Sequence, residues 1–297
     1  MNQPTILVTG ATGNVGRPLI AGLLAKGARV RALTRNPAKA GLPPQVEVSG
    51  GDSTTPGAFA DAVRGADAVF VNIGAIRTGL GDLLAAARDA GVSKLVLLSS
   101  TTVRDQGDQV SALGAQHKLA EDAVKASGID WTILRCSGFA TNTLAWAATI
   151  RTDGVVRAPY GQAAMALIAE QDIAAAAVRT LLDPGHGGQT YYLTGQRSLT
   201  QVQQAAAIAT AIGRPVRFQE LPPETFRQSA TQRFPAAVVD DLLRTWATSV
   251  GQTADTAPDL EKVIGRPATS YAQWAAQHAD AYRRPPDSDA TPNALPN

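Results

Sequence analysis

The chain has 297 residues, of which 44% are hydrophobic and 18% are charged. This balance is typical of a folded globular protein, and the length predicts one large domain with a smaller second one. Because 27 basic residues are dispersed among 25 acidic ones, for a formal net charge of +2, the composition argues against a nucleic-acid partner.

The single cysteine, Cys136, excludes an internal disulfide and a cysteine-based metal cage, which is typical of a reducing compartment. No spacing of His, Asp and Glu indicates a metal site. The N-terminal segment lacks the features of a signal peptide, and no segment approaches the roughly 20 apolar residues that span a bilayer. We therefore expect a cytoplasmic protein without a membrane partner.

Strands alternate with helices of ten or more residues in the first half of the chain. Short apolar runs predict strands at residues 5–9, 29–33, 45–48, 66–71, 94–98 and 131–134. Helical spacing predicts helices from about residue 15 to 24, at 80–90 and at 112–127. Such alternation requires crossover connections, so the sequence predicts a Rossmann-type, doubly wound α/β fold with a mainly parallel sheet.

The pattern loosens after about residue 140. We expect residues 1–155 to form the dinucleotide-binding domain, with 165–195 returning to it through a helix at 173–182 and a strand at 190–193. Residues 196–282 predict a smaller, mainly helical substrate subdomain. Residues 283–297 carry four prolines and no apolar periodicity, so a disordered tail is expected.

Three glycines, Gly10, Gly13 and Gly16, lie between the first strand and the first helix. Their order of strand, turn and helix is what a dinucleotide-binding fingerprint requires. Glycine permits the tight turn and the close approach of the backbone to a pyrophosphate, whose charge then lies at the positive end of a helix. The turn therefore predicts a bound dinucleotide.

The second strand is followed by Arg35, and no acidic residue occurs from Gly27 through Pro44. NAD-binding proteins usually have a carboxylate here for the ribose 2′-hydroxyl, whereas an arginine can pair with a 2′-phosphate. NADPH is therefore the expected cofactor, with Lys39 as a further basic residue. Asp52, after the third strand, is a candidate for the adenine amino group or an ordinary turn residue.

These motifs together resemble the NmrA-like family of atypical short-chain dehydrogenase/reductases. The matching segments are Thr9 through Gly16, Thr34-Arg35-Asn36, Gly51-Asp52, Ser127 through Arg135, Phe139 with Asn142, Asp172-Ile-Ala174, Tyr192 through Gly195, and the Gly-Arg-Pro triplets at 213–215 and 265–267. The family holds NADPH-dependent quinone and other carbonyl-type reductases, and also regulators that bind the dinucleotide without turning it over. The resemblance thus implies the fold and the cofactor and leaves catalysis open.

The fingerprint, the ends of the strands and the resemblance together give the expected cofactor-binding residues, with a plain turn as the alternative for Asn72 and Gly74. The expected residues are Thr9, Gly10, Thr12, Gly13, Asn14, Val15, Gly16, Thr34, Arg35, Asp52, Asn72, Gly74, Ser99 and Lys118. For a small-molecule substrate the candidates are Thr101, Phe139, Asn142 and Tyr160.

Short-chain dehydrogenases place a catalytic tyrosine four residues before a lysine. Here Lys118 occupies the lysine position, but Gly114 stands where the tyrosine belongs. Lys118 or His117 then remains as proton donor, and Glu121, one turn from His117, would orient and partly charge its imidazole. An exposed His117 paired with Glu121, without a site role, is the alternative.

The expected function is NADPH-dependent hydride transfer to a quinone or related conjugated carbonyl compound, which needs little acid catalysis. A non-catalytic NADPH-sensing regulator is the second hypothesis, and a non-redox tailoring enzyme on the same fold is the third.

Overall fold

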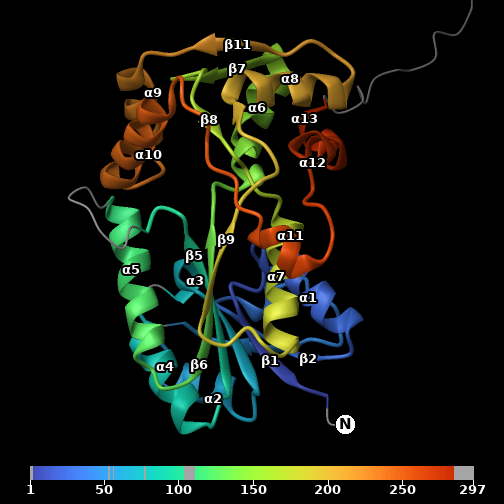
Figure 1. The fold of residues 1–297 in the computed structure, drawn as a ribbon, viewed down its shortest axis with the longest axis vertical. Helices are drawn as coiled ribbons and strands as arrows, with labels where there is room; N and C mark the ends of the chain where they lie inside the picture. The colour runs from blue at the N-terminus through green and yellow to red at the C-terminus, as the bar shows by residue number, and fades with distance from the viewer. Residues whose placement is uncertain (1–2, 53, 56, 77, 104–110, 284–297) are drawn as a thin grey trace, which may run out of the picture.

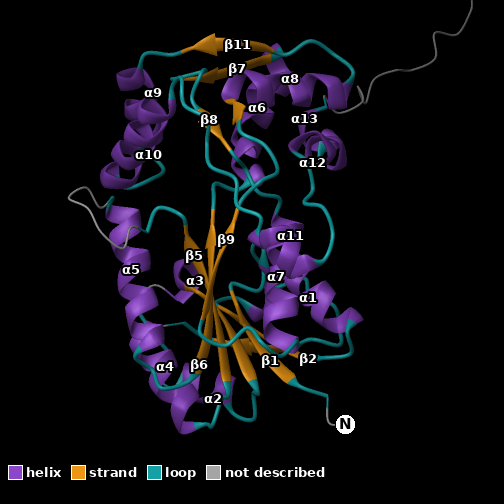
Figure 2. Ribbon diagram, viewed as in Figure 1, coloured by secondary structure: helices purple, strands orange, loops and turns teal. Residues whose placement is uncertain are grey.

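The computed structural model describes residues 3–283 except 53, 56, 77 and 104–110. Its centre is a seven-stranded sheet in the order β3-β2-β1-β4-β5-β6-β9, with every neighbouring pair parallel (Figures 1 and 2). The strands are β1 (Thr5–Thr9), β2 (Arg29–Thr34), β3 (Glu47–Gly50), β4 (Ala68–Asn72), β5 (Lys94–Ser100), β6 (Asp130–Cys136) and β9 (Gln189–Leu193). The predicted doubly wound parallel sheet is confirmed.

One strand lies later than predicted. The run at 45–48 predicted β3, but the ladder to β2 begins with the pair Arg31 and Glu47 and ends with Thr34 and Gly50. Pairing partners across the sheet, rather than the local apolar run, decide where this strand begins.

Helices cover both faces of the sheet. On one face, α1 (Gly16–Ala25), α7 (Glu170–Leu182) and α11 (Asp259–Ile264) bury a core that includes Leu19, Ile173 and Phe70. On the other face are α2 (Ala58–Val63), α4 (Leu80–Asp89) and α5 (Ala112–Lys125). The sequence did not predict α2 or α3 (Ile73–Ile76), because six and four residues are too few to establish helical periodicity.

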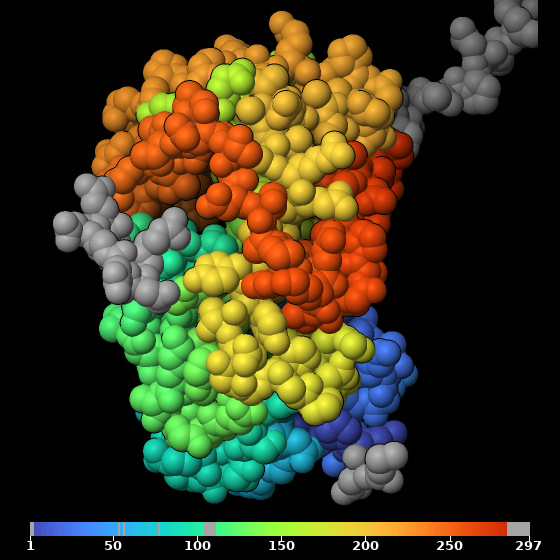
Figure 3. Space-filling model, in the orientation of Figure 1, coloured from blue at the N-terminus to red at the C-terminus, as the bar shows by residue number. Residues whose placement is uncertain are grey.

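The remaining elements form a mainly helical region at the carboxyl end of the sheet (Figure 1), and Figure 3 shows the surface of the molecule in the same orientation. Its helices are α6 (Ala147–Asp153), α8 (Gln201–Ile212), α9 (Pro223–Ala230), α10 (Ala236–Ser249), α12 (Tyr271–Gln277) and α13 (Ala279–Tyr282). A 3₁₀ turn, η2 (Ala140–Trp146), leads into α6, and another, η1 (Pro37–Lys39), follows β2 of the main sheet. Two small sheets join β7 (Val155–Ala158) to β11 (Arg217–Glu220) and β8 (Ala164–Met165) to β10 (Leu199–Thr200).

This region has its own core, centred on the fully buried Trp274 and Tyr282. The structure does not describe the predicted tail beyond Arg283.

A buried carboxylate ties the C-terminal segment to α7. Asp172 is fully buried, and its two oxygens accept from the Arg266 guanidinium at 2.6 Å and from the Thr269 amide at 2.6 Å. Both Asp172 and the Gly265-Arg-Pro267 triplet are segments on which the family resemblance rests. Their contact holds the chain between α11 and α12 against the start of α7.

A second buried carboxylate ties α5 to the sheet. Glu121 is fully buried, and Arg135 on β6 donates to it through Nε at 2.9 Å and Nη2 at 2.7 Å. Ser99 on β5 donates to the same carboxylate at 2.6 Å, and Tyr192 on β9 accepts from Arg135 Nη1 at 2.6 Å. One ion pair therefore connects a helix with three neighbouring strands.

Replacing Glu121 by Ala removes the carboxylate to which a buried guanidinium donates twice. We expect the free energy of unfolding to fall by about 3–5 kcal/mol, the range for breaking a buried pair on one side. The matched control is Asp122→Ala, which removes an exposed pair with Lys118 on the same helix and should cost less than about 1 kcal/mol. Urea unfolding measures both, and equal losses would contradict a structural role for the buried pair.

Candidate functional site

The glycine turn connects β1 to α1 at the carboxyl edge of the sheet. Gly10 has φ +68°, and its carbonyl accepts from the Gly13 amide at 3.0 Å. A Cβ on Gly16 would lie 2.2 Å from the Gly10 carbonyl oxygen, so a side chain has no room there. The structure thus gives a reason for glycine at positions 10 and 16, and the exposed backbone of the turn fits a diphosphate at the start of a helix.

The neighbours of the turn hold it in place. The buried Thr9 hydroxyl donates to the Phe70 carbonyl at 3.0 Å and accepts from the Asn72 amide at 2.7 Å, which joins β1 to β4. The Asn72 side chain abuts Gly10, and its Oδ1 accepts from the Gly74 amide at 3.1 Å. These contacts make Thr9 and Asn72 supports of the turn. The predicted Val15 is also a core residue, 3% exposed.

The segment after β2 presents Arg35 to solvent. Arg35 is exposed and forms no hydrogen bond or ion pair with the residues that the structure describes, so its guanidinium is available to a ligand. Asp52, by contrast, accepts from the amide of Thr54 at 2.8 Å and from its hydroxyl at 2.6 Å. This contact favours the turn interpretation of Asp52.

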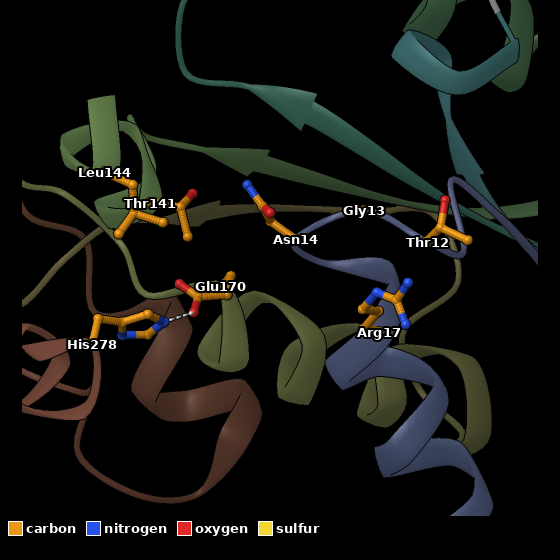
Figure 4. Close-up of a pocket in the computed structure, with 8 residues that line it drawn as sticks. All are labelled: Thr12, Gly13, Asn14, Arg17, Thr141, Leu144, Glu170 and His278. Atoms are coloured by element: carbon orange, nitrogen blue, oxygen red, sulfur yellow. Dashed lines mark ion pairs between the residues drawn. The ribbon is translucent and has the colours of Figure 1, made fainter. Parts of the chain in front are cut away.

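A pocket of about 240 Å³ joins the glycine turn to the C-terminal region (Figure 4). Its lining residues are Thr12, Gly13, Asn14, Arg17, Thr141, Leu144, Glu170 and His278. Figure 4 shows Glu170 and His278 together on one side of the pocket, with Asn14 and Arg17 toward the other. Residues about 260 positions apart in the chain therefore share one cavity.

His278 lines this pocket with 27% of its side chain exposed. Its Nε2 lies 3.1 Å from Glu170 Oε1, and its ring stacks on that of Trp274 with 4.3 Å between centroids. Trp274 Nε1 donates to the second Glu170 oxygen at 2.8 Å. The Thr141 hydroxyl, in the same pocket, is buried and has no hydrogen-bond partner among the described residues. The glycine motif predicted Thr12, Gly13 and Asn14, but no sequence motif pointed to Thr141, Glu170 or His278, because they come from separate elements.

The helix α5 carries the residues expected for catalysis. At Gly114, a Cβ would lie 2.6 Å from the Thr102 carbonyl oxygen, so the backbone leaves no space for the family's tyrosine. One turn later, Lys118 Nζ lies 2.6 Å from both Asp122 oxygens, with 35% of its side chain exposed.

His117 is not the exposed, Glu121-paired residue that the sequence offered as one alternative. Glu121 bonds to Arg135 and Ser99 instead, and His117 Nδ1 is buried without a hydrogen-bond partner in the described part of the chain. Burial lowers the pKa of the His117 imidazole, and the Glu121 charge opposes this shift only in part. Ser99 is 3% exposed, and its hydroxyl is engaged by Glu121.

The predicted substrate residues fall in two places. Thr101, Phe139 and Asn142 follow β5 and β6 at the carboxyl edge, where Phe139 bridges to Ile168. Tyr160 lies in the β7–β8 connection within the C-terminal region, and its φ of +58° is the one positive value among the described residues other than glycine. Their roles stay predictions.

Among the described residues, no helix is both long and apolar enough to cross a membrane. The same part of the chain holds no cluster of three or more His, Cys, Asp or Glu side chains able to bind a metal ion.

Comparison with known proteins places this site in a family. A model of NAD(P)H-binding proteins matches residues 10–184, which begin in the glycine turn and end after α7. The chain belongs to this NAD(P)H-binding family. The fold implied by the resemblance to NmrA-like short-chain dehydrogenase/reductases is confirmed as well, since NmrA and an NADPH-dependent quinone oxidoreductase are among the similar structures.

Three similar proteins illustrate the range of sequence identity and of named function. The (4-alkanoyl-5-oxo-2,5-dihydrofuran-3-yl)methyl phosphate reductase of Streptomyces griseus is 38% identical, over 93% of this chain and 99% of its own length. An NADPH-dependent quinone oxidoreductase of Escherichia coli, solved with NADPH, is 29% identical over 92% of this chain and 99% of that one, with a TM-score of 0.77. The negative transcriptional regulator NmrA, solved with NADP, covers 93% of this chain and 95% of its own at 18% identity and a TM-score of 0.72, which shows a shared fold alone.

The substitution Gly16→Ala tests the close approach in the turn. The added Cβ must displace the Gly10 carbonyl, so we expect a loss of about 1–3 kcal/mol in stability together with weakened dinucleotide binding. Gly81→Ala is the matched control, because that helical glycine has open space around it and an alanine there should be neutral or stabilising. Thermal unfolding and dinucleotide titration measure the two effects, and equal behaviour of both variants would contradict the geometry.

The lowered pKa of His117 predicts a dependence of stability on pH. Between the folded and unfolded pKa values the unfolded chain binds the extra proton, so stability should decrease as pH falls from 7 to 5. His117→Asn should reduce this slope in urea unfolding. His186, whose pKa burial also lowers but which is less buried, provides the comparison, and His186→Asn should reduce the slope less. An unchanged slope in His117→Asn would contradict the assignment.

Proposed function

We propose that this chain is an NADPH-dependent oxidoreductase that reduces a conjugated carbonyl compound, such as a quinone or an α,β-unsaturated lactone. The observation that carries the proposal is the glycine turn together with an exposed Arg35 that pairs with none of the described residues, in a chain whose relatives include reductases. Bound NADPH supplies a hydride. The chain's part is to hold the diphosphate at the turn from Gly10 to Gly16 and the 2′-phosphate at Arg35.

The class of acceptor is argued from the chemistry that relatives share. The dihydrofuranone named in the Streptomyces griseus reductase has a ring double bond conjugated with both its lactone carbonyl and its alkanoyl group. A quinone likewise carries carbonyls conjugated with its double bonds. In both, the negative charge that reduction creates spreads onto carbonyl oxygens, so the demand on a protein acid is small.

This low demand agrees with the residues around Gly114. A positioned general acid contributes about 10²–10⁴ in rate, and the fold leaves no space for a tyrosine there. Of the two remaining candidates, Lys118 is favoured over His117, because burial lowers the pKa of the imidazole and leaves it neutral near pH 7. Lys118 can leave Asp122 at small cost, since exposed pairs one turn apart are worth about 0.3–0.5 kcal/mol.

A non-catalytic dinucleotide sensor is the second candidate. The missing tyrosine favours it, and the regulator NmrA shows that the fold can serve such a role. The two candidates predict the same binding and differ only in turnover.

The experiment measures binding first and then turnover. NADPH and NADH are titrated by calorimetry, and NADPH oxidation is followed with a panel of quinones, α-acyl butenolides and simple ketones. We expect turnover with the conjugated acceptors and little with the ketones. Failure to bind either dinucleotide would refute the proposal, and tight NADPH binding without turnover on any acceptor would support the sensor.

The variant Arg35→Ala tests the choice of cofactor within the same titrations. A charge-assisted contact worth about 1.5–3 kcal/mol corresponds to a ten- to hundredfold loss of NADPH affinity, whereas NADH should be nearly unaffected. Arg88→Ala, an exposed arginine on α4, is the matched control. Equal losses for NADPH and NADH in Arg35→Ala would refute the assigned role of Arg35.

A further inference from the structure

We infer that Arg17 is a positioning residue that sets the preference for NADPH, acting through the segment 35–41 that carries Arg35. The inference rests on the proposed function, because it assumes that Arg35 receives the 2′-phosphate. Arg17 lies just after the glycine turn, as the second residue of α1, and lines the same pocket as Gly13 and Asn14. The glycine fingerprint does not include it.

The contact is a fork between one guanidinium and two successive carbonyls. Arg17 Nη1 donates to the Gly41 oxygen at 2.8 Å, and Nη2 donates to the Ala40 oxygen at 2.9 Å. Both bonds reach across more than 20 residues of chain, from the helix to the segment after β2. Only arginine presents two parallel N–H groups in a fixed plane, whereas lysine offers a single ammonium on a flexible stem.

The rest of the segment is held at its start and middle. The Asn36 amide donates to Thr34 Oγ1 at 3.3 Å, and Pro37 packs so closely over Gly50 that a Cβ there would lie 2.9 Å from the proline ring. The Arg17 fork holds the far end, where Ala40 is 3% exposed. The backbone on both sides of Arg35 is therefore fixed, while its guanidinium remains in solvent.

This arrangement is preorganisation of a charged side chain. A flexible segment would have to be ordered when the 2′-phosphate binds, and that cost would lower affinity for NADPH without changing affinity for NADH. Arg17 reduces this cost by ordering the segment beforehand. Its effect should therefore appear in discrimination between the two ligands and should depend on Arg35.

The test uses two small probes, adenosine 2′,5′-bisphosphate and 5′-AMP, which differ by the 2′-phosphate. Calorimetry gives their affinities for the unmodified protein, Arg17→Lys, Arg35→Ala and the double variant, with Arg88→Lys as the matched control. In Arg17→Lys we expect a threefold to tenfold loss for the bisphosphate, about the net contribution of one hydrogen bond, and less than a twofold loss for 5′-AMP. In the Arg35→Ala background the same change should have no selective effect.

Other outcomes overturn the inference. Equal losses for both probes in Arg17→Lys would mean that Arg17 serves adenosine or 5′-phosphate binding in general. A selective loss that persists in Arg35→Ala would mean that Arg17 contacts the 2′-phosphate itself. If Arg35→Ala alone leaves the discrimination intact, the assignment of Arg35 in the proposed function fails, and the positioning role of Arg17 fails with it.

Hydrogen exchange provides a readout that needs no ligand. In Arg17→Lys, amides from residue 36 to 42 should exchange faster while the rest of the chain is unchanged, which also verifies folding. Unchanged exchange in this segment would overturn the positioning role even if affinities change.

Discussion

The close approach of Gly16 to the Gly10 carbonyl is the constraint on which the candidate site depends. It brings the start of α1 directly against the end of β1, so that the amino end of the helix lies at the backbone of the turn. The same approach places Arg17 within reach of the segment after β2 and places Asn14 in the pocket shared with the C-terminal region. A single side chain at position 16 would disturb all three relationships, because each depends on where the helix begins.

Two buried carboxylates position the elements that surround this turn. Glu121 holds α5 against β5 and β6, and Asp172 holds the segment before α12 against α7. Burying a charge is costly unless it is paired and hydrogen-bonded, and both carboxylates meet this condition through an arginine and a further donor. His278, which directly follows α12, lies in the pocket beside the glycine turn.

The backbone around Gly114 differs from the arrangement common to short-chain dehydrogenases, in which a catalytic tyrosine stands at this position. The Thr102 carbonyl occupies the space that a side chain at position 114 would need, so the absence of the tyrosine is built into the backbone. The proposed conjugated acceptors, which stabilise their own negative charge, agree with this backbone.

The sequence by itself determined the parallel sheet, the glycine turn and the basic segment after β2, because these depend on local periodicity and on residues adjacent in the chain. Landmarks such as Asp172 and the Gly265-Arg-Pro267 triplet were visible in the sequence, but their contact was not. Only the tertiary structure decided that Glu121 pairs with Arg135 rather than His117, that His278 lines the pocket, and that Arg17 reaches Ala40 and Gly41. Such contacts join residues far apart in the chain, and partners of this kind leave no periodic pattern because packing in three dimensions selects them.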